Sequence, residues 1–109
     1  MERTLVQMDD PIFMPSVAKI ANLSFTVIPP GAMGTVELYI GSKSATSGAK
    51  NFVSTGSAQS ISLPVTMPTA PGVYHVYIDV VIGSILAGAY QATEDIFIIG
   101  VTVGPITWA

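Results

Sequence analysis

The residues from Pro71 to Gln91 carry the clearest structural pattern in this chain. Between Tyr74 and Ile82 every second residue is apolar, and the residues between them are mixed. An apolar face opposite a mixed face is typical of a strand that is buried on one side. The Gly83-Ser84 pair then fits a tight turn, because glycine takes the positive φ that a type II′ hairpin requires. A second run from Ile85 to Ala92 returns along the first, so the sequence predicts a long β-hairpin.

Other alternating runs lie on both sides of this hairpin. They cover residues 22–28, 35–40, 51–54, 60–67 and 95–103. Pro64 falls within one of them and predicts an edge strand, because proline cannot donate a ladder hydrogen bond. The polar stretch from Gly41 to Lys50 has no periodicity and is expected to be a loop. The side chains expected to form the core are Phe25, Val27, Leu38, Ile61, Leu63, Tyr74, Val76, Ile78 and Val80.

No run of useful length has the period of a helix, and the strands recur with Pro and Gly between them. This spacing favours an all-β fold, an antiparallel β-sandwich of about seven to nine strands. A single domain over residues 17–109 is expected, preceded by an extended arm over residues 1–16. Pro11 and Pro15 prevent the arm from forming one long strand or helix.

The run ISLPVTMPTAPGVYHVYIDVVI resembles the E strand, the E–F turn and the F strand of immunoglobulin-like and fibronectin-type sandwiches. Bacterial and archaeal domains related to cell adhesion have a similar P-G-x-Y-x-V-x-V pattern. Tyr74 lies where such domains place the tyrosine of the tyrosine corner. The resemblance implies a hydroxyl that bonds back to the preceding turn and a ring that packs in the core. It covers about residues 22–103 and concerns the fold alone.

The composition limits the classes of partner. The net charge is −3, which argues against nucleic acid as the main partner. The first residues, MERTLVQMDD, show no signal peptide, and the uncharged runs are interrupted by glycine, so no membrane partner is expected. There is no cysteine to form a disulfide or a thiolate metal site. Only 10% of the residues are charged, against about 25% in a typical soluble domain.

The residues that could carry chemistry are few and scattered. His75 and Asp79 lie on the same face of the predicted strand but about 13 Å apart along it, too far to share a ligand. The acidic pairs Asp9-Asp10 and Glu94-Asp95 lack the spacing of a calcium loop. The Gly31–Gly34 stretch lacks the Lys-Ser/Thr ending of a phosphate loop. The sequence therefore predicts no catalytic residue, cofactor or metal, and a chain that is not an enzyme.

The sequence favours a role in assembly. Apolar side chains outside the alternating pattern would be costly to leave in water, at about 25 cal/mol per Å². These expected subunit contacts are Leu5, Val6, Met8, Ile12, Phe13, Met14 and Trp108. The sequence thus favours a structural subunit that binds copies of itself or other structural proteins, such as a virion decoration protein, a minor capsid protein or a filament subunit, in a virion or an extracellular assembly.

Two alternatives remain open at this point. One is an adhesion or carbohydrate-binding module, in which the rings of Tyr39, Tyr77 and Tyr90 line a face on which sugars stack, with Tyr39 and Tyr77 as the expected ligand contacts. The other is a domain that only spaces the parts of a larger protein. For the arm, packing against another subunit is the favoured expectation, and folding back over its own domain is the alternative.

Overall fold

The computed structural model describes residues 3–8, 11–102 and 104–108. Eleven strands are found in these residues, and no helix. The strands are β1 (Thr4–Val6), β2 (Ile12–Phe13), β3 (Ala18–Thr26), β4 (Met33–Ile40), β5 (Ser42–Thr46), β6 (Lys50–Val53), β7 (Ala58–Thr66), β8 (Gly72–Tyr74), β9 (Val76–Ile82), β10 (Ile85–Ala92) and β11 (Ile96–Ile98). The all-β prediction is confirmed.

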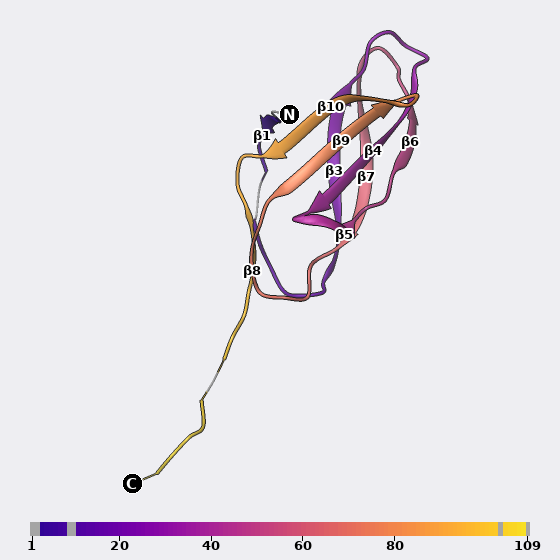
Figure 1. Ribbon diagram of the computed structural model, residues 1–109. Helices are drawn as coiled ribbons and strands as arrows, with labels where there is room; N and C mark the ends of the chain where they lie inside the picture. The colour runs from indigo at the N-terminus through magenta and orange to yellow at the C-terminus, as the bar shows by residue number, and fades with distance from the viewer. Residues whose placement is uncertain (1–2, 9–10, 103, 109) are drawn as a thin grey trace.

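The strands form one large sheet and two small ones (Figure 1). The large sheet has six strands in the order β1-β10-β9-β4-β5, and β6 also pairs with β4. The second sheet has the order β2-β11-β8, and the third consists of β3 and β7. The predicted hairpin is present as β9 and β10, with Ile82 opposite Ile85 and Gly83 at φ 62°. Its first strand is shorter than expected, because β8 leaves the run at His75 and joins a different sheet.

The prediction of a purely antiparallel architecture is wrong at the arm. Here β1 runs parallel to β10, and β2 runs parallel to β11. Both arm strands therefore join sheets of their own chain, and Pro11 and Pro15 confine them to short lengths. The two arm strands, together with β5 and β8, bring the count above the predicted seven to nine.

Two further boundaries differ from the sequence prediction. The stretch expected to be a loop contains β5, which turns back on β4 through Gly41 at φ 72°. The last strand ends at Ile98 rather than near residue 103. Beyond it, the described residues of the chain extend away from the body as the yellow segment of Figure 1.

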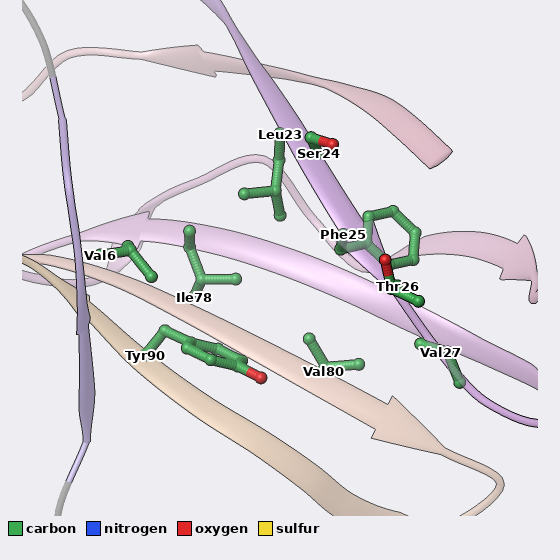
Figure 2. Close-up of a pocket in the computed structure, with 9 residues that line it drawn as sticks. All are labelled: Val6, Leu23, Ser24, Phe25, Thr26, Val27, Ile78, Val80 and Tyr90. Atoms are coloured by element: carbon green, nitrogen blue, oxygen red, sulfur yellow. The ribbon is translucent and has the colours of Figure 1, made fainter. Parts of the chain in front are cut away.

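The β3–β7 sheet covers only part of the inner face of the large sheet. Along the described chain β3 pairs with β7 alone, so its other edge is free. Figure 2 shows this edge, with Leu23 and Phe25 on β3 facing Val6, Ile78 and Tyr90 across an open pocket. The strand that contains Pro64 is an edge strand, as expected, because among the described strands β7 pairs with β3 alone. On β7, Pro64 is exposed and lies opposite Ile20 of β3.

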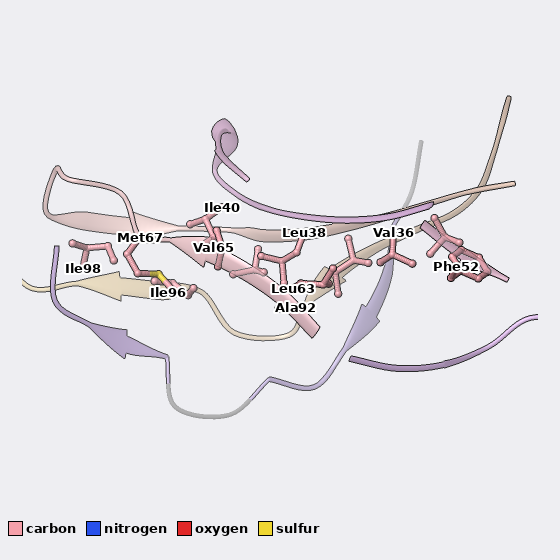
Figure 3. Packing of buried hydrophobic residues seen from close by; sticks show 13 residues of the cluster. Val36, Leu38, Ile40, Phe52, Leu63, Val65, Met67, Ala92, Ile96 and Ile98 are labelled. Atoms are coloured by element: carbon pink, nitrogen blue, oxygen red, sulfur yellow. The ribbon is translucent and has the colours of Figure 1, made fainter. Parts of the chain in front are cut away.

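The core lies between these two layers as an elongated band (Figure 3). Leu63 and Val65 of β7 pack against the inward residues of β4 and β9, and Ile96 and Ile98 of β11 extend the band at one end. Five of the predicted core residues are buried: Leu38, Leu63, Val76, Ile78 and Val80. Four are only half-buried against the same cluster: Phe25, Val27, Ile61 and Tyr74.

Candidate functional site

Two tyrosines of the predicted ligand face, Tyr39 and Tyr77, lie next to each other on the outer face of the large sheet. The third, Tyr90, was wrongly assigned to that face, because it lies opposite the inward-facing Ile78 and lines the inner pocket. Tyr39 of β4 is directly opposite Tyr77 of β9, and their ring centroids are 5.2 Å apart at an angle of 36°. Successive side chains of a strand point to opposite faces, so these rings project away from the core that Leu38 and Ile78 enter. The register of β4 and β9 therefore creates the paired aromatic surface.

The next outward-facing pair of the same two strands is acidic. Glu37 lies opposite Asp79. Like charges at directly opposed positions destabilise a sheet. Two cations offset this repulsion: Arg3 Nη1 is 2.7 Å from Asp79 Oδ1, and Lys43 Nζ is 3.2 Å from Glu37 Oε1. We call these four charged residues, together with Tyr39 and Tyr77, the outer-face cluster.

Arg3 connects the charged and the aromatic halves of the outer-face cluster. Its guanidinium carbon lies 4.7 Å from the ring centroid of Tyr77, within cation–π range, and Nη2 donates to Tyr39 Oη at 2.7 Å. Nη1 also donates to the carbonyl oxygen of Tyr90 at 3.2 Å. The pairing of β1 with β10 brings Arg3 to this position. The guanidinium thus occupies a ring surface on which a sugar would stack.

The protonation equilibria agree with a cluster that neutralises itself. Partial burial lowers the pKa of Arg3, but the hydrogen bond and the charge of Asp79 raise it above its ordinary value. Burial, and then the negative charge of Asp79, raise the pKa of Tyr39. The hydrogen bond to Glu37, and then its charge, raise the pKa of Lys43. At neutral pH the two cations are therefore charged and the Tyr39 hydroxyl is protonated.

His75 has a partner that sequence reasoning missed. Its Nδ1 lies 2.6 Å from Asp95 Oδ1, whereas Asp79, the neighbour weighed from the sequence, pairs with Arg3. This contact depends on the antiparallel pairing of β8 with β11. Tyr74 lies opposite Ile96, and the residues next to them, His75 and Asp95, are therefore brought together. Within the described part of the chain no hydroxyl group is hydrogen-bonded to His75, so no nucleophile–base pair is formed there.

The described residues hold neither a cluster of metal ligands nor a membrane-spanning helix. Across residues 3–8, 11–102 and 104–108, no three His, Asp or Glu side chains come together as metal ligands. The acidic pair Asp9-Asp10 lies outside the described residues. None of the residues described forms a helix that is long and apolar enough to cross a membrane.

The expected subunit contacts divide into two groups. Val6, Met8 and Phe13 are half-buried against the core of their own chain. Leu5, Ile12 and Met14 point outward and are 62%, 62% and 59% exposed. Trp108, near the end of the chain, is 92% exposed. The arm therefore packs on its own domain with one face and presents apolar side chains to solvent with the other.

More apolar side chains are exposed than the seven that the sequence predicted as subunit contacts. Large apolar side chains with more than half of their surface exposed also occur on the strands, in the turns and in the segment after β11. They are Ile20, Ile28, Met33, Val53, Val73, Ile85, Val101 and Ile106. These positions break the alternation or lie outside strands, so the periodicity of the sequence did not predict that they are exposed.

Comparison with known protein families, with characterised proteins and with solved structures finds no match to this chain. Function must therefore be argued from the surfaces themselves. Two stand out: the outer-face cluster, whose charges pair with one another, and the exposed apolar residues of the arm and of the chain end.

Proposed function

We propose that this protein is a non-enzymatic structural subunit that associates with copies of itself or with other structural proteins of the same assembly. The observation that carries the proposal is the exposed apolar segment after β11. Val101, Ile106 and Trp108 are 80%, 78% and 92% exposed, and this segment runs away from the body (Figure 1). Apolar surface of this kind is stabilised when it is removed from water by contact with another surface.

The low charge of the surface supports the same function. Only 10% of the residues are charged, and the outer-face cluster uses four of them in internal ion pairs, Arg3 with Asp79 and Lys43 with Glu37. Monomeric soluble proteins rarely expose large contiguous apolar patches to solvent. Burial of such surface between subunits yields about 25 cal/mol per Å². A virion decoration protein, a minor capsid protein or a filament subunit would bury it in this way.

We further propose that the fold is of the immunoglobulin-like or fibronectin type. Two features support this assignment. The core lies between two packed layers of strands, and the Tyr74 hydroxyl donates to the carbonyl oxygen of Ala70 at 2.7 Å. That bond is the one the resemblance to a tyrosine corner implies. The mixed strand directions at the arm are additions to this plan.

A carbohydrate-binding or adhesion module is the second candidate, because Tyr39 and Tyr77 form a paired aromatic surface. Arg3 already occupies part of that surface, so a sugar would have to displace a guanidinium that has three hydrogen-bond contacts. A screen of immobilised glycans tests this candidate. Binding that is lost in Tyr77→Ala would support it.

Light scattering and native mass measurement over a range of concentrations test the structural proposal. We expect species larger than one chain, with a population that increases with concentration. A chain that remains monomeric at all accessible concentrations and binds glycans through Tyr77 would replace the structural function by the second candidate.

A further inference from the structure

The free edge of β3 is an unsatisfied pairing surface. Along the described chain β3 is hydrogen-bonded to β7 on one side only, over the whole length from Ala18 to Thr26. The backbone N–H and C=O groups of alternate residues therefore point away from β7 with no strand to receive them. An edge of this kind is a template for an added strand.

Beside this edge lies an apolar groove. One part, with a volume of about 190 Å³, is bounded by Leu23 and Phe25 of β3 and by Ile78, Val80 and Tyr90 of the large sheet (Figure 2). A second part, of about 710 Å³, continues along β3 toward β2. Leu23, Phe25 and Tyr90 remain only half-buried here, because the β3–β7 sheet is too narrow to cover the inner face of the large one. We call this space the β3 groove.

The segment after β11 has the features of a strand without a sheet. Over residues 99–108 it carries no charge, and Ile99 and Val101 alternate with Gly100 and Thr102. The Ile99 N–H still donates to the carbonyl oxygen of Phe13 at 3.1 Å, and Gly104-Pro105 interrupts the segment, so a new strand pairing is expected to begin after Ile99 and to be interrupted at Gly104-Pro105. We call residues 99–108 the tail. In its lack of charge and its apolar character the tail matches the space beside β3.

We infer that the tail of one copy inserts into the β3 groove of a second copy and pairs with the free edge of β3. The inference rests on the proposed structural function and specifies the contact through which two copies associate. The inserted strand widens the β3–β7 sheet, and the Val101 side chain enters the groove toward Ile78 and Val80. Among the described residues that line the groove, Lys19 is the charged one, and the tail is uncharged, so insertion brings no like charges together there.

The geometry favours a second copy over the tail's own groove. The tail leaves β11 at Ile98 and continues away from the body, so that the described part of the chain measures 73 × 25 × 23 Å. Its radius of gyration is 17.2 Å, against about 13 Å for a compact domain of this size. Tail and groove are different surfaces, so each copy can donate one tail and accept another. Such head-to-tail contacts produce a ring or an open filament.

A charge placed on the tail tests the insertion. Val101→Asp would bring an unpaired carboxylate into an apolar groove, and we expect the association constant to fall at least about tenfold. Thr102→Asp is the matched control, because it adds the same charge on the opposite face of the tail. Trp108 is the one tryptophan of the chain, so its emission reports the tail directly. On association we expect a blue shift that Val101→Asp abolishes and Thr102→Asp retains.

A peptide experiment separates groove binding from other contacts. The acceptor is the full-length chain with Val101→Asp and Trp108→Phe, which keeps the groove and removes the acceptor's own tryptophan emission. A synthetic peptide of residues 97–108 should bind it, one peptide per chain, with a blue shift of the peptide's tryptophan. The same peptide with Val101→Asp is the control and should not bind.

The outcomes distinguish the inference from the proposed function. If the wild-type chain associates, but Val101→Asp associates equally well and the peptide does not bind, tail insertion is overturned and the structural function stands. If the wild-type chain is always monomeric, the self-association in the proposed function and tail insertion into a second copy both fail. If that monomer melts at a lower temperature with Val101→Asp, the tail fills its own groove, which overturns insertion into a second copy.

Discussion

At the scale of single residues, the outer-face cluster shows how few charges this fold needs. Glu37 and Asp79 face each other across β4 and β9, and the cations that offset them come from elsewhere in the chain. Arg3 is 76 residues away from Asp79 in the sequence. Alternation placed Tyr39 and Tyr77 on the outward faces of their strands. No local pattern could connect Arg3 to them, because that contact depends on the pairing of β1 with β10.

Tyr74→Phe tests the bond between the tyrosine hydroxyl and the Ala70 carbonyl group. The substitution keeps the ring and removes the donor, so we expect a loss of about 0.5 to 1.5 kcal/mol in the free energy of unfolding. Urea denaturation measures it. Tyr77→Phe is the control, since in the described part of the chain its hydroxyl has no hydrogen-bond partner. Equal losses in the two variants would remove the special role of Tyr74.

Gly34→Ala tests a close approach between β4 and its neighbours. A Cβ atom at Gly34 would collide with the carbonyl oxygen of Val81 and lie 3.1 Å from the Phe52 ring. Overpacking of this kind costs about 1 to 3 kcal/mol, and we expect a loss in that range. Gly104→Ala is the matched control, because nothing lies within 4 Å of the added atom. A Gly34→Ala variant as stable as wild type would show that β4 can move away freely.

Tyr39 predicts a dependence of stability on pH. Its pKa is raised in the folded state, first by burial, so the folded chain holds the hydroxyl proton more tightly than the unfolded chain does. The corresponding stability is complete below the ordinary tyrosine pKa of about 10 and is lost as the pH rises beyond it. Between pH 9 and pH 11 the wild type should therefore lose more stability than Tyr39→Phe. Equal losses in urea denaturation would contradict the assignment.

At the scale of elements, the sequence predicted those strands that bury a face. The alternation over residues 35–40, 60–67 and 76–82 corresponds to β4, β7 and β9, whose inward residues form the core. β5 (Ser42–Thr46) was not predicted, because most of its residues are small and polar and show no alternation. Its formation depends on pairing with β4. The parallel pairing of the two arm strands could not be predicted either, because a partner far along the chain produces no pattern in a short local sequence.

Ile78→Ala tests whether the faces of β9 are assigned correctly. Ile78 is 6% exposed between Leu38 of β4 and Tyr90 of β10, and its truncation should lower the free energy of unfolding by about 2 to 5 kcal/mol. The control is Ile85→Ala, which removes the same atoms from a side chain that is 70% exposed. Its cost should stay within about 0.5 kcal/mol. If the control costs as much as Ile78→Ala, the inner and outer faces have been exchanged.

At the scale of the whole molecule, the two ends of the chain behave differently. The arm joins two sheets and places Val6, Met8 and Phe13 against the core, while the tail leaves the body. From composition alone both ends were expected to be apolar contact segments. Separating them required the topology, since β1 lies beside β10 and so bounds the β3 groove, whereas β11 ends at Ile98. The apolar content of an end therefore does not tell whether it completes its own fold or a neighbour's.

Deletion of residues 1–14 measures what the arm contributes to its own domain. The deletion removes β1, β2 and three half-buried side chains, at about 1.5 to 3 kcal/mol for each when fully buried, together with the Arg3–Asp79 ion pair. We expect a loss of at least about 3 kcal/mol and a melting midpoint lower by at least about 10 °C. Replacing Leu5, Ile12 and Met14 together by serine is the control. It keeps the inner side chains and removes only exposed ones, so the midpoint of the single chain should not change. A truncated chain that melts with the wild type as a smaller species would instead make the arm a clamp between subunits.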